Sequence, residues 1–144
     1  PRFAHQPLAK TLRFCEPNAE LLAKQAEIVF LALPHGVAAE YAIPLLQLGC
    51  VVIDLSADFR LRSAEVYKDF YAHDHPAPEL LAKAVYGLPE HYREQIQQSQ
   101  LIASPGCYPT SILLPTSFGV EPLVSIIVTS AVSRPVSSDS IIVL

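Results

Sequence analysis

The amino-acid sequence predicts an α/β fold built on a parallel β-sheet. Two features carry this prediction: short continuous apolar runs alternate with segments of helical periodicity, and the connections between them are short. Continuous apolar runs are typical of strands that are buried on both faces, and strands that alternate with helices pair in parallel through right-handed crossovers. The chain has 144 residues, of which 51% are hydrophobic, so it can bury the core of one domain.

The predicted helices carry apolar residues on one face and have recognisable ends. Asn18 is suited to cap the first helix, Gly49 to end the second, and Pro89 to stand in the first turn of the last. Pro44 lies inside the second helix and predicts a kink there. These helices are expected over residues 17–27, 37–49, 63–71 and 89–99.

The predicted strands are runs of β-branched and other apolar residues between polar or proline-rich segments. They are expected over residues 28–33, 50–55 and 101–104, whereas the prolines of residues 73–78 predict a loop. From about Thr116 the composition changes, and few residues are charged. There, residues 125–133 and 137–144 resemble strands, which suggests the start of a second domain or spliced remains of one.

Polar residues follow the predicted strands, and we expect them at one edge of the sheet. In parallel sheets, ligands bind beyond the carboxyl ends of the strands. Those ends carry Pro-His-Gly at residues 34–36, Ser-Ala-Asp-Phe-Arg at 56–60 and Pro-Gly-Cys at 105–107. The sequence therefore predicts a functional site where these three segments meet.

Composition and charge argue against several classes of protein. The net charge of −4 gives no reason to expect a nucleic-acid partner, and from these residues we expect neither a membrane-spanning segment nor a signal peptide. The cysteines at 15, 50 and 107 lack metal-like spacing and indicate reduced thiols in a cytoplasmic protein. Because the chain starts at Pro1 and contains no methionine, we expect a fragment or ordered pieces of a longer protein.

Cys107 is the candidate nucleophile. It follows Pro105-Gly106, which predicts a tight turn, and precedes a predicted helix. Amide groups at a helix N-terminus favour a thiolate and can stabilise an oxyanion formed when that thiolate attacks a carbonyl. The alternative is a small buried hydrophobic residue, which free cysteine usually is. We assign that packing role to Cys15 and Cys50.

Arg60 is the candidate anion-binding residue. It lies just beyond a predicted strand, where a guanidinium can hold a phosphate or carboxylate by two parallel hydrogen bonds; the alternative is a surface arginine. Asp58 is expected either to pair with Arg60 or to cap the turn. For Asp54 we expect hydrogen bonds to backbone amides at the strand end rather than a role as a base.

The histidines yield no metal site and no base for Cys107. His35 is placed to line a nucleotide pocket through its backbone or its ring. His73 and His75 flank an aspartate, but a third ligand at a recognisable spacing is missing, so we expect solvated loop residues. His5 and His91 carry no specific signal, and none of the five stands out as a general base.

The strand-end motifs resemble those of N-acetyl-gamma-glutamyl-phosphate reductases, a family of arginine biosynthesis. Weaker similarity to aspartate-semialdehyde dehydrogenase indicates the wider superfamily. The motifs occur in the family's order and cover residues 28 to 115: they are FLALPHG, VVIDLSADFRL, AVYGLPE and LIASPGCYPT. The resemblance implies that residues 1–106 form part of a Rossmann-like NADP-binding domain, and that 107–144 are the start of, or fragments from, an α+β catalytic and dimerisation domain.

The resemblance also implies a reaction. The family uses NADPH to reduce the acyl phosphate of N-acetylglutamate to N-acetylglutamate 5-semialdehyde, with release of phosphate. Cys107 matches the catalytic cysteine, which forms a thioester that hydride reduces, and Arg60 matches the arginine that holds the substrate phosphate. Gly106 would let the backbone approach the nicotinamide. The remaining residues that match segments bordering the dinucleotide are Pro34, His35, Gly36 and Ser56.

The chain departs from the family pattern in three places. The glycine-rich dinucleotide turn has no counterpart, residues 125–138 lack the family's glycines, and the histidine expected as general base is missing after Cys107. A chain with these departures should bind NADP poorly and turn over little. The resemblance further implies a cytoplasmic homo-oligomer, dimer or tetramer. The alternatives are a reductase of another amino-acid acyl phosphate, such as the aminoadipate type, a non-catalytic nucleotide-binding module, or an inactive remnant.

Overall fold

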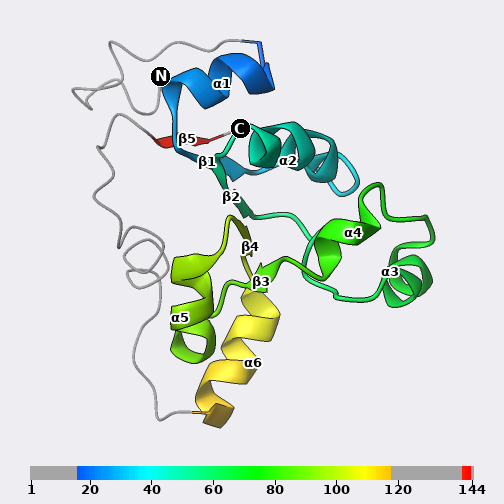
Figure 1. Ribbon diagram of the computed structural model, residues 1–144. Helices are drawn as coiled ribbons and strands as arrows, with labels where there is room; N and C mark the ends of the chain where they lie inside the picture. The colour runs from blue at the N-terminus through cyan, green and yellow to red at the C-terminus, as the bar shows by residue number, and fades with distance from the viewer. Residues whose placement is uncertain (1–15, 118–140, 144) are drawn as a thin grey trace, which may run out of the picture.

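The computed structural model describes residues 16–117 and 141–143 and has an α/β fold, as predicted. Its sheet has five strands in the order β3-β4-β2-β1-β5, and every neighbouring pair is parallel (Figure 1). The strands are β1 (Ile28–Leu31), β2 (Val51–Asp54), β3 (Val85–Tyr86), β4 (Leu101–Ala103) and β5 (Ile141–Val143). β1, β2 and β4 are shorter than the predicted runs but begin within one residue of them.

Helices cover both faces of this sheet. They are α1 (Ala19–Gln25), α2 (Ala38–Gln47), α3 (Ala64–Tyr71), α4 (Pro78–Leu81), α5 (Pro89–Gln98) and α6 (Cys107–Ser117). Alternate strand residues point to opposite faces. Val29, Leu31 and Val52 pack with α1, α2 and α4 in one buried cluster, whereas Ile53 and Ile102 pack with α5 in another. The result is a three-layered arrangement with a core on each side of the sheet.

The helix ends follow the local sequence. The Asn18 side chain accepts a hydrogen bond from the Leu21 amide at 3.0 Å, which confirms the predicted cap of α1. Gly49 ends α2 with a φ of 87°, and its amide donates to the Leu46 carbonyl at 3.1 Å. This left-handed residue costs little as glycine and is common just beyond a helix. α2 continues through Pro44 to Gln47, and the kink remains a prediction.

Two elements were not predicted. The four-residue helix α4 begins at the end of the predicted loop 73–78, and the two-residue strand β3 lies at the sheet edge beside β4. Gly87 follows β3 and donates its amide to the Ala103 carbonyl at 2.7 Å. A Cβ on Gly87 would stand 3.0 Å from that carbonyl oxygen, a tight contact, so a glycine favours the close approach of β3 to β4.

Strand β5 lies in the part of the chain that the sequence predicted to belong to a second domain. The predicted strand 137–144 is present as β5, which pairs in parallel with β1. The sequence predicted the start of, or fragments from, a second domain here, and within the described residues β5 adds a strand beside β1. The domain boundary at 106/107 remains a prediction, and the predicted strand 125–133 lies outside the described residues.

Candidate active site

The three predicted segments meet at the carboxyl edge of the sheet. The Ser104 amide donates to the Asp54 carbonyl at 2.8 Å, which joins the ends of β2 and β4. The Gly36 amide donates to both carboxylate oxygens of Asp58, at 2.8 and 3.0 Å, which joins the end of β1 to the loop after β2. This geometry confirms the expectation that polar residues gather at one edge.

Arg60 bridges two strand ends through its guanidinium. Nε donates to the Ser104 carbonyl at 2.8 Å and Nη2 to the Leu55 carbonyl at 2.9 Å. Five N–H groups are available on a guanidinium, so these two bonds leave donors for a ligand. Because both acceptors belong to the main chain beyond the strands, the sheet itself fixes the position of the charge.

Gly106 makes room for this guanidinium. A Cβ on Gly106 would lie 3.2 Å from Nη1 of Arg60 and 3.4 Å from Cδ of Pro109. The Gly106 carbonyl also accepts hydrogen bonds from the amide and the hydroxyl of Thr110, at 3.1 and 2.9 Å, which start α6. The sequence suggested that Gly106 lets backbone approach the cofactor, and the structure adds that it lets Arg60 approach the residue before Cys107.

Cys107 is the first residue of α6, as the turn before it predicted. Its thiol is exposed, and Tyr108 beside it is 79% exposed. The first N–H groups of a helix have no partner within the helix and carry partial positive charge. An exposed thiol at this position, one residue beyond the glycine that Arg60 approaches, can act as a nucleophile, whereas the alternative packing role requires burial. Cys50 does have that role, because it is buried, donates to the Ala26 carbonyl at 3.5 Å and has a pKa raised by burial.

Asp54 and Ser56 form a buried network below this edge. Asp54 accepts from the Ser56 amide and from the Ser56 hydroxyl, each at 2.9 Å, which confirms that it bonds backbone amide at the strand end. Burial raises the pKa of Asp54, against the effect of these two hydrogen bonds. The Ser56 hydroxyl also accepts from the Asp58 amide at 3.1 Å. Its side chain therefore faces the interior, and a contact with a dinucleotide would use the Ser56 backbone.

Asp58 caps the start of α2, whereas Arg60 donates to the main-chain carbonyls of Ser104 and Leu55. Besides Gly36, its carboxylate accepts from the Ala39 amide at 3.3 Å and from the Tyr67 hydroxyl at 3.2 Å. Val37, the residue before α2, provides no side-chain cap of its own. Of the two predicted alternatives for Asp58, capping is confirmed. The Gly36 amide is consequently engaged and is not free to bind a phosphate.

The histidines near this edge have structural partners. Nδ1 of His35 accepts from the Ala57 amide at 3.3 Å, and its ring is exposed. His73 is exposed, as expected for a loop residue. The same expectation was wrong for His75, which is only 6% exposed because its ring packs against Tyr67 and hydrogen-bonds to the main chain. Neither these histidines nor any other described group of acidic, histidine and cysteine residues forms a metal-binding cluster.

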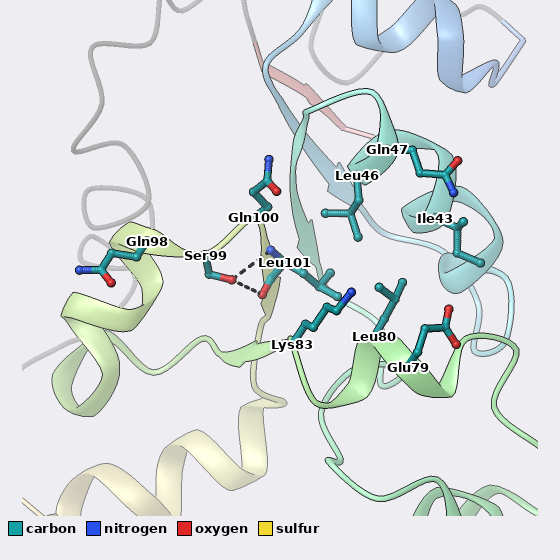
Figure 2. Close-up of a pocket in the computed structure, with 10 residues that line it drawn as sticks. All are labelled: Ile43, Leu46, Gln47, Glu79, Leu80, Lys83, Gln98, Ser99, Gln100 and Leu101. Atoms are coloured by element: carbon teal, nitrogen blue, oxygen red, sulfur yellow. Dashed lines mark hydrogen bonds between the residues drawn. The ribbon is translucent and has the colours of Figure 1, made fainter.

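A cleft in the described part of the chain lies away from this edge. It has a volume of about 570 Å³ and lies between the end of α2, α4 and the segment that leads into β4 (Figure 2). Ser99 and Leu101 line it at the amino end of β4, opposite to the edge that carries Cys107. None of the predicted site residues lines this cleft, so we place the active site by its chemistry and not by cavity size.

Comparison with known proteins identifies the family. Residues 2–99 match the model of the semialdehyde dehydrogenase NAD-binding domain. The chain belongs to the semialdehyde dehydrogenase family. The predicted family and the Rossmann-like fold are thereby confirmed, and a nicotinamide dinucleotide is the cofactor class of this domain. None of the described helices of this family member is long and apolar enough to cross a membrane.

Individual relatives narrow the comparison within the semialdehyde dehydrogenase family. The chain is 55% identical over 116 residues to an N-acetyl-gamma-glutamyl-phosphate reductase of Akkermansia muciniphila, a match that covers 80% of this chain and 33% of that protein. It is 49% identical to the reductase of the same name from Magnetococcus marinus, over 79% of this chain and 35% of that protein. A [LysW]-L-2-aminoadipate/[LysW]-L-glutamate phosphate reductase of Saccharolobus solfataricus is 51% identical, over 72% of this chain and 30% of that protein. The chain thus spans about a third of the length of these relatives.

Sequence reasoning missed two buried residues that hold Asp58 in place at the carboxyl edge of the sheet. His75 and Tyr67 lie 17 and nine residues from Asp58 in sequence, and each bonds to it in the structure. The available signal was the dipeptide His75-Pro76, which follows a helix rich in aromatic residues. The sequence predicted a solvated loop for that dipeptide. The requirement for glycine at 87 and 106 also depends on contacts that periodicity does not report.

Proposed function

We propose that the full-length protein is an NADPH-dependent N-acetyl-gamma-glutamyl-phosphate reductase. One observation carries the proposal: an exposed thiol begins α6, and the residue before it lies against the guanidinium of Arg60. A nucleophile beside a fixed cation suits an acyl phosphate, since it provides both an attacking atom and a site for the leaving phosphate. The similarity of the chain to reductases of this name supports N-acetylglutamyl as the acyl group of the substrate.

Cys107 would act by covalent catalysis. Its thiolate attacks the acyl carbon, the bond from that carbon to the phosphate oxygen breaks, and phosphate leaves with the electron pair. The acyl group is then held as a thioester, and after reduction the thiolate leaves again as the aldehyde is released. Two easier steps replace one hard displacement. The partial positive charge at the start of α6 stabilises the oxyanion of each tetrahedral species.

Arg60 would hold the phosphate during the first of these steps. Two of its N–H groups are bound to main-chain carbonyls, so the plane of the guanidinium is fixed before substrate arrives. The remaining donors can bind two phosphate oxygens, and their charge stabilises the departing dianion. Preorganised charge of this kind costs no reorganisation at the moment of reaction.

The cofactor would lie along the carboxyl edge, and NADPH supplies the hydride when it is bound. Pro34 and His35 are exposed at the end of β1, where a dinucleotide can lie against them. The carboxylate of Asp58 occupies the amides at the start of α2, so the diphosphate would bind away from that helix. Support for NADP over NAD comes from the family resemblance, as does support for a cytoplasmic homo-oligomer.

An aminoadipate-type reductase is the second candidate. The 51% identity to the reductase from Saccharolobus solfataricus favours it, since the name of that relative includes an aminoadipate phosphate. The thiol and the guanidinium would do the same chemistry in both enzymes, and residues other than Cys107 and Arg60 would recognise the acyl chain.

The reverse reaction of the full-length protein tests the proposal. Purified enzyme is given NADP⁺, phosphate and N-acetylglutamate 5-semialdehyde, and NADPH formation is followed by absorbance. We expect turnover that depends on phosphate, a lower rate with NAD⁺, and a much lower rate with the one-carbon-longer aminoadipate semialdehyde. Preference for the longer substrate would favour the second candidate. The absence of turnover with either aldehyde would overturn both.

A further inference from the structure

His75 is a buried histidine that the proposed chemistry does not use. Its ring is 6% exposed and lies between Tyr67 and Phe59, with ring centroids 4.7 and 5.4 Å away. Nδ1 accepts from the Ala77 amide at 3.0 Å. Since Nδ1 is an acceptor, the neutral ring carries its proton on Nε2, which donates to the Asp58 carbonyl at 2.8 Å. Nδ1 therefore makes a local bond within its own loop, whereas Nε2 connects this loop to a segment 17 residues away.

His75 bonds to Asp58, and Asp58 connects several segments at the carboxyl edge of the sheet. The Asp58 carboxylate receives the amides of Gly36 and Ala39, and so fixes both the turn after β1 and the start of α2. The Tyr67 hydroxyl donates to the same carboxylate. Asp58 is itself fully buried. The Asp58 main chain is held by His75 and its side chain by three donors, so this residue has little freedom to rotate.

Asp58 also lies two residues before Arg60. The Arg60 amide donates to the Ala57 carbonyl at 3.4 Å, so the segment between them is a turn. A rotation of the peptide after Asp58 would move the start of the Arg60 side chain and strain its bonds to Ser104 and Leu55. One buried segment thus links the turn at residues 34–36 with the guanidinium that lies against Gly106.

We propose that His75 is a positioning residue, which holds the Asp58 segment through its Nε2 proton so that the dinucleotide edge and Arg60 are fixed together. Its consequence for catalysis rests on the proposed function, whereas its consequence for the turn at 34–36 does not. The groups that face the His75 ring are the uncharged rings of Tyr67 and Phe59 and the main chain of Asp58 and Ala77. The nearby Lys68–Asp74 ion pair, with its side chains 59% and 82% exposed, lies at the surface.

Two conservative variants separate the two nitrogens. In His75→Gln the terminal amide N–H can reach the Asp58 carbonyl, which restores the Nε2 donor. In His75→Asn the shorter side chain can accept from the Ala77 amide two residues on, which restores only the Nδ1 acceptor. Asp74→Asn is the matched control, since Asp74 precedes His75 in the same loop and its side chain is 82% exposed. All three are made in the full-length protein.

Hydrogen exchange of the peptide that spans residues 34–40 is the first readout, and it needs no activity. We expect exchange in His75→Asn to be faster than in wild type by about tenfold, the effect of one lost hydrogen bond. His75→Gln and Asp74→Asn should exchange at nearly the wild-type rate. If His75→Asn does not fold, Tyr67→Phe takes its place, because it removes one donor to the Asp58 carboxylate; unchanged exchange of the peptide in that variant would overturn the proposal.

The kinetics of the reverse reaction are the second readout. We expect the KM values for phosphate and NADP⁺ to rise together by about tenfold in His75→Asn, with kcat per reactive Cys107 thiol within about threefold of wild type and with recovery in His75→Gln. A merely structural role would lower the fraction of active enzyme in both variants and leave KM unchanged. Equal behaviour of Gln and Asn in the exchange experiment would overturn the proposal, and an inactive wild type with the expected exchange pattern would overturn the proposed function alone.

Discussion

Replacement of Arg60 by lysine should weaken phosphate binding while the positive charge is kept. The guanidinium makes hydrogen bonds of 2.8 and 2.9 Å to the Ser104 and Leu55 carbonyls and still presents donors beside Gly106. A lysine ammonium is a point charge on a flexible stem and cannot bridge two carbonyls and bind a phosphate in the same geometry. A hydrogen bond to a charged group contributes about 1.5–3 kcal/mol. Since Arg60 is half-buried, we take the lower part of this range for one lost bond.

A loss of about 2 kcal/mol corresponds to a rise of about 30-fold in the KM for phosphate. The assay is the reverse reaction of full-length enzyme with NADP⁺ and aldehyde saturating and phosphate varied. Arg62→Lys is the control, because Arg62 lies two residues on and is exposed, and its KM should stay near the wild-type value. A KM for phosphate within twofold of wild type in Arg60→Lys would refute the proposed role of the guanidinium.

Three further variants test packing and electrostatics in the full-length protein. Gly106→Ala puts a Cβ 3.2 Å from Nη1 of Arg60, so we expect a KM for phosphate raised by about fivefold, and an unchanged KM would contradict the contact. Gly87→Ala puts a Cβ 3.0 Å from the Ala103 carbonyl oxygen, which cannot move aside; about 1–3 kcal/mol of lost stability should lower the Tm by several degrees, and a wild-type Tm would count against this packing. Burial and the carboxylate beside it raise the pKa of Tyr67 above its usual value near 10, so the stability that Tyr67 contributes is present below about pH 10 and is lost as the unfolded chain ionises. Urea unfolding should therefore show Tyr67→Phe less stable than wild type at pH 8, with a gap that narrows above about pH 10; a constant gap would exclude the shifted pKa.

The gathering of Arg60 and Cys107 at one edge could be predicted from the sequence. Continuous apolar runs reveal buried parallel strands, and the carboxyl ends of such strands share an edge whatever their order. The bridge from Arg60 to the Ser104 and Leu55 carbonyls is a geometric refinement of that prediction. The start of α6 at Cys107 likewise follows from the local Pro-Gly turn.

The contacts that hold Asp58 in place behind the carboxyl edge could not be predicted in this way. His75 bonds to a residue 17 positions away, and Gly36 to one 22 positions away, so neither contact leaves a local pattern. β3 has only two residues, which is too short to show an alternation of apolar and polar side chains. Its place at the sheet edge also depends on the connection from β2, which passes over the position that β4 later occupies. Burial of His75 was misjudged for the same reason, because loop composition indicates solvent exposure unless a distant partner is known.

The role of Cys107 is the central claim, and one substitution tests it most directly. In the reverse reaction, full-length wild type and Cys107→Ser are compared with NADP⁺, phosphate and N-acetylglutamate 5-semialdehyde, and hydrogen exchange verifies that the variant is folded. We expect kcat to fall by several orders of magnitude, because an un-ionised hydroxyl replaces a thiolate nucleophile. Comparable rates in the two proteins would contradict the account and return Cys107 to a role other than nucleophile.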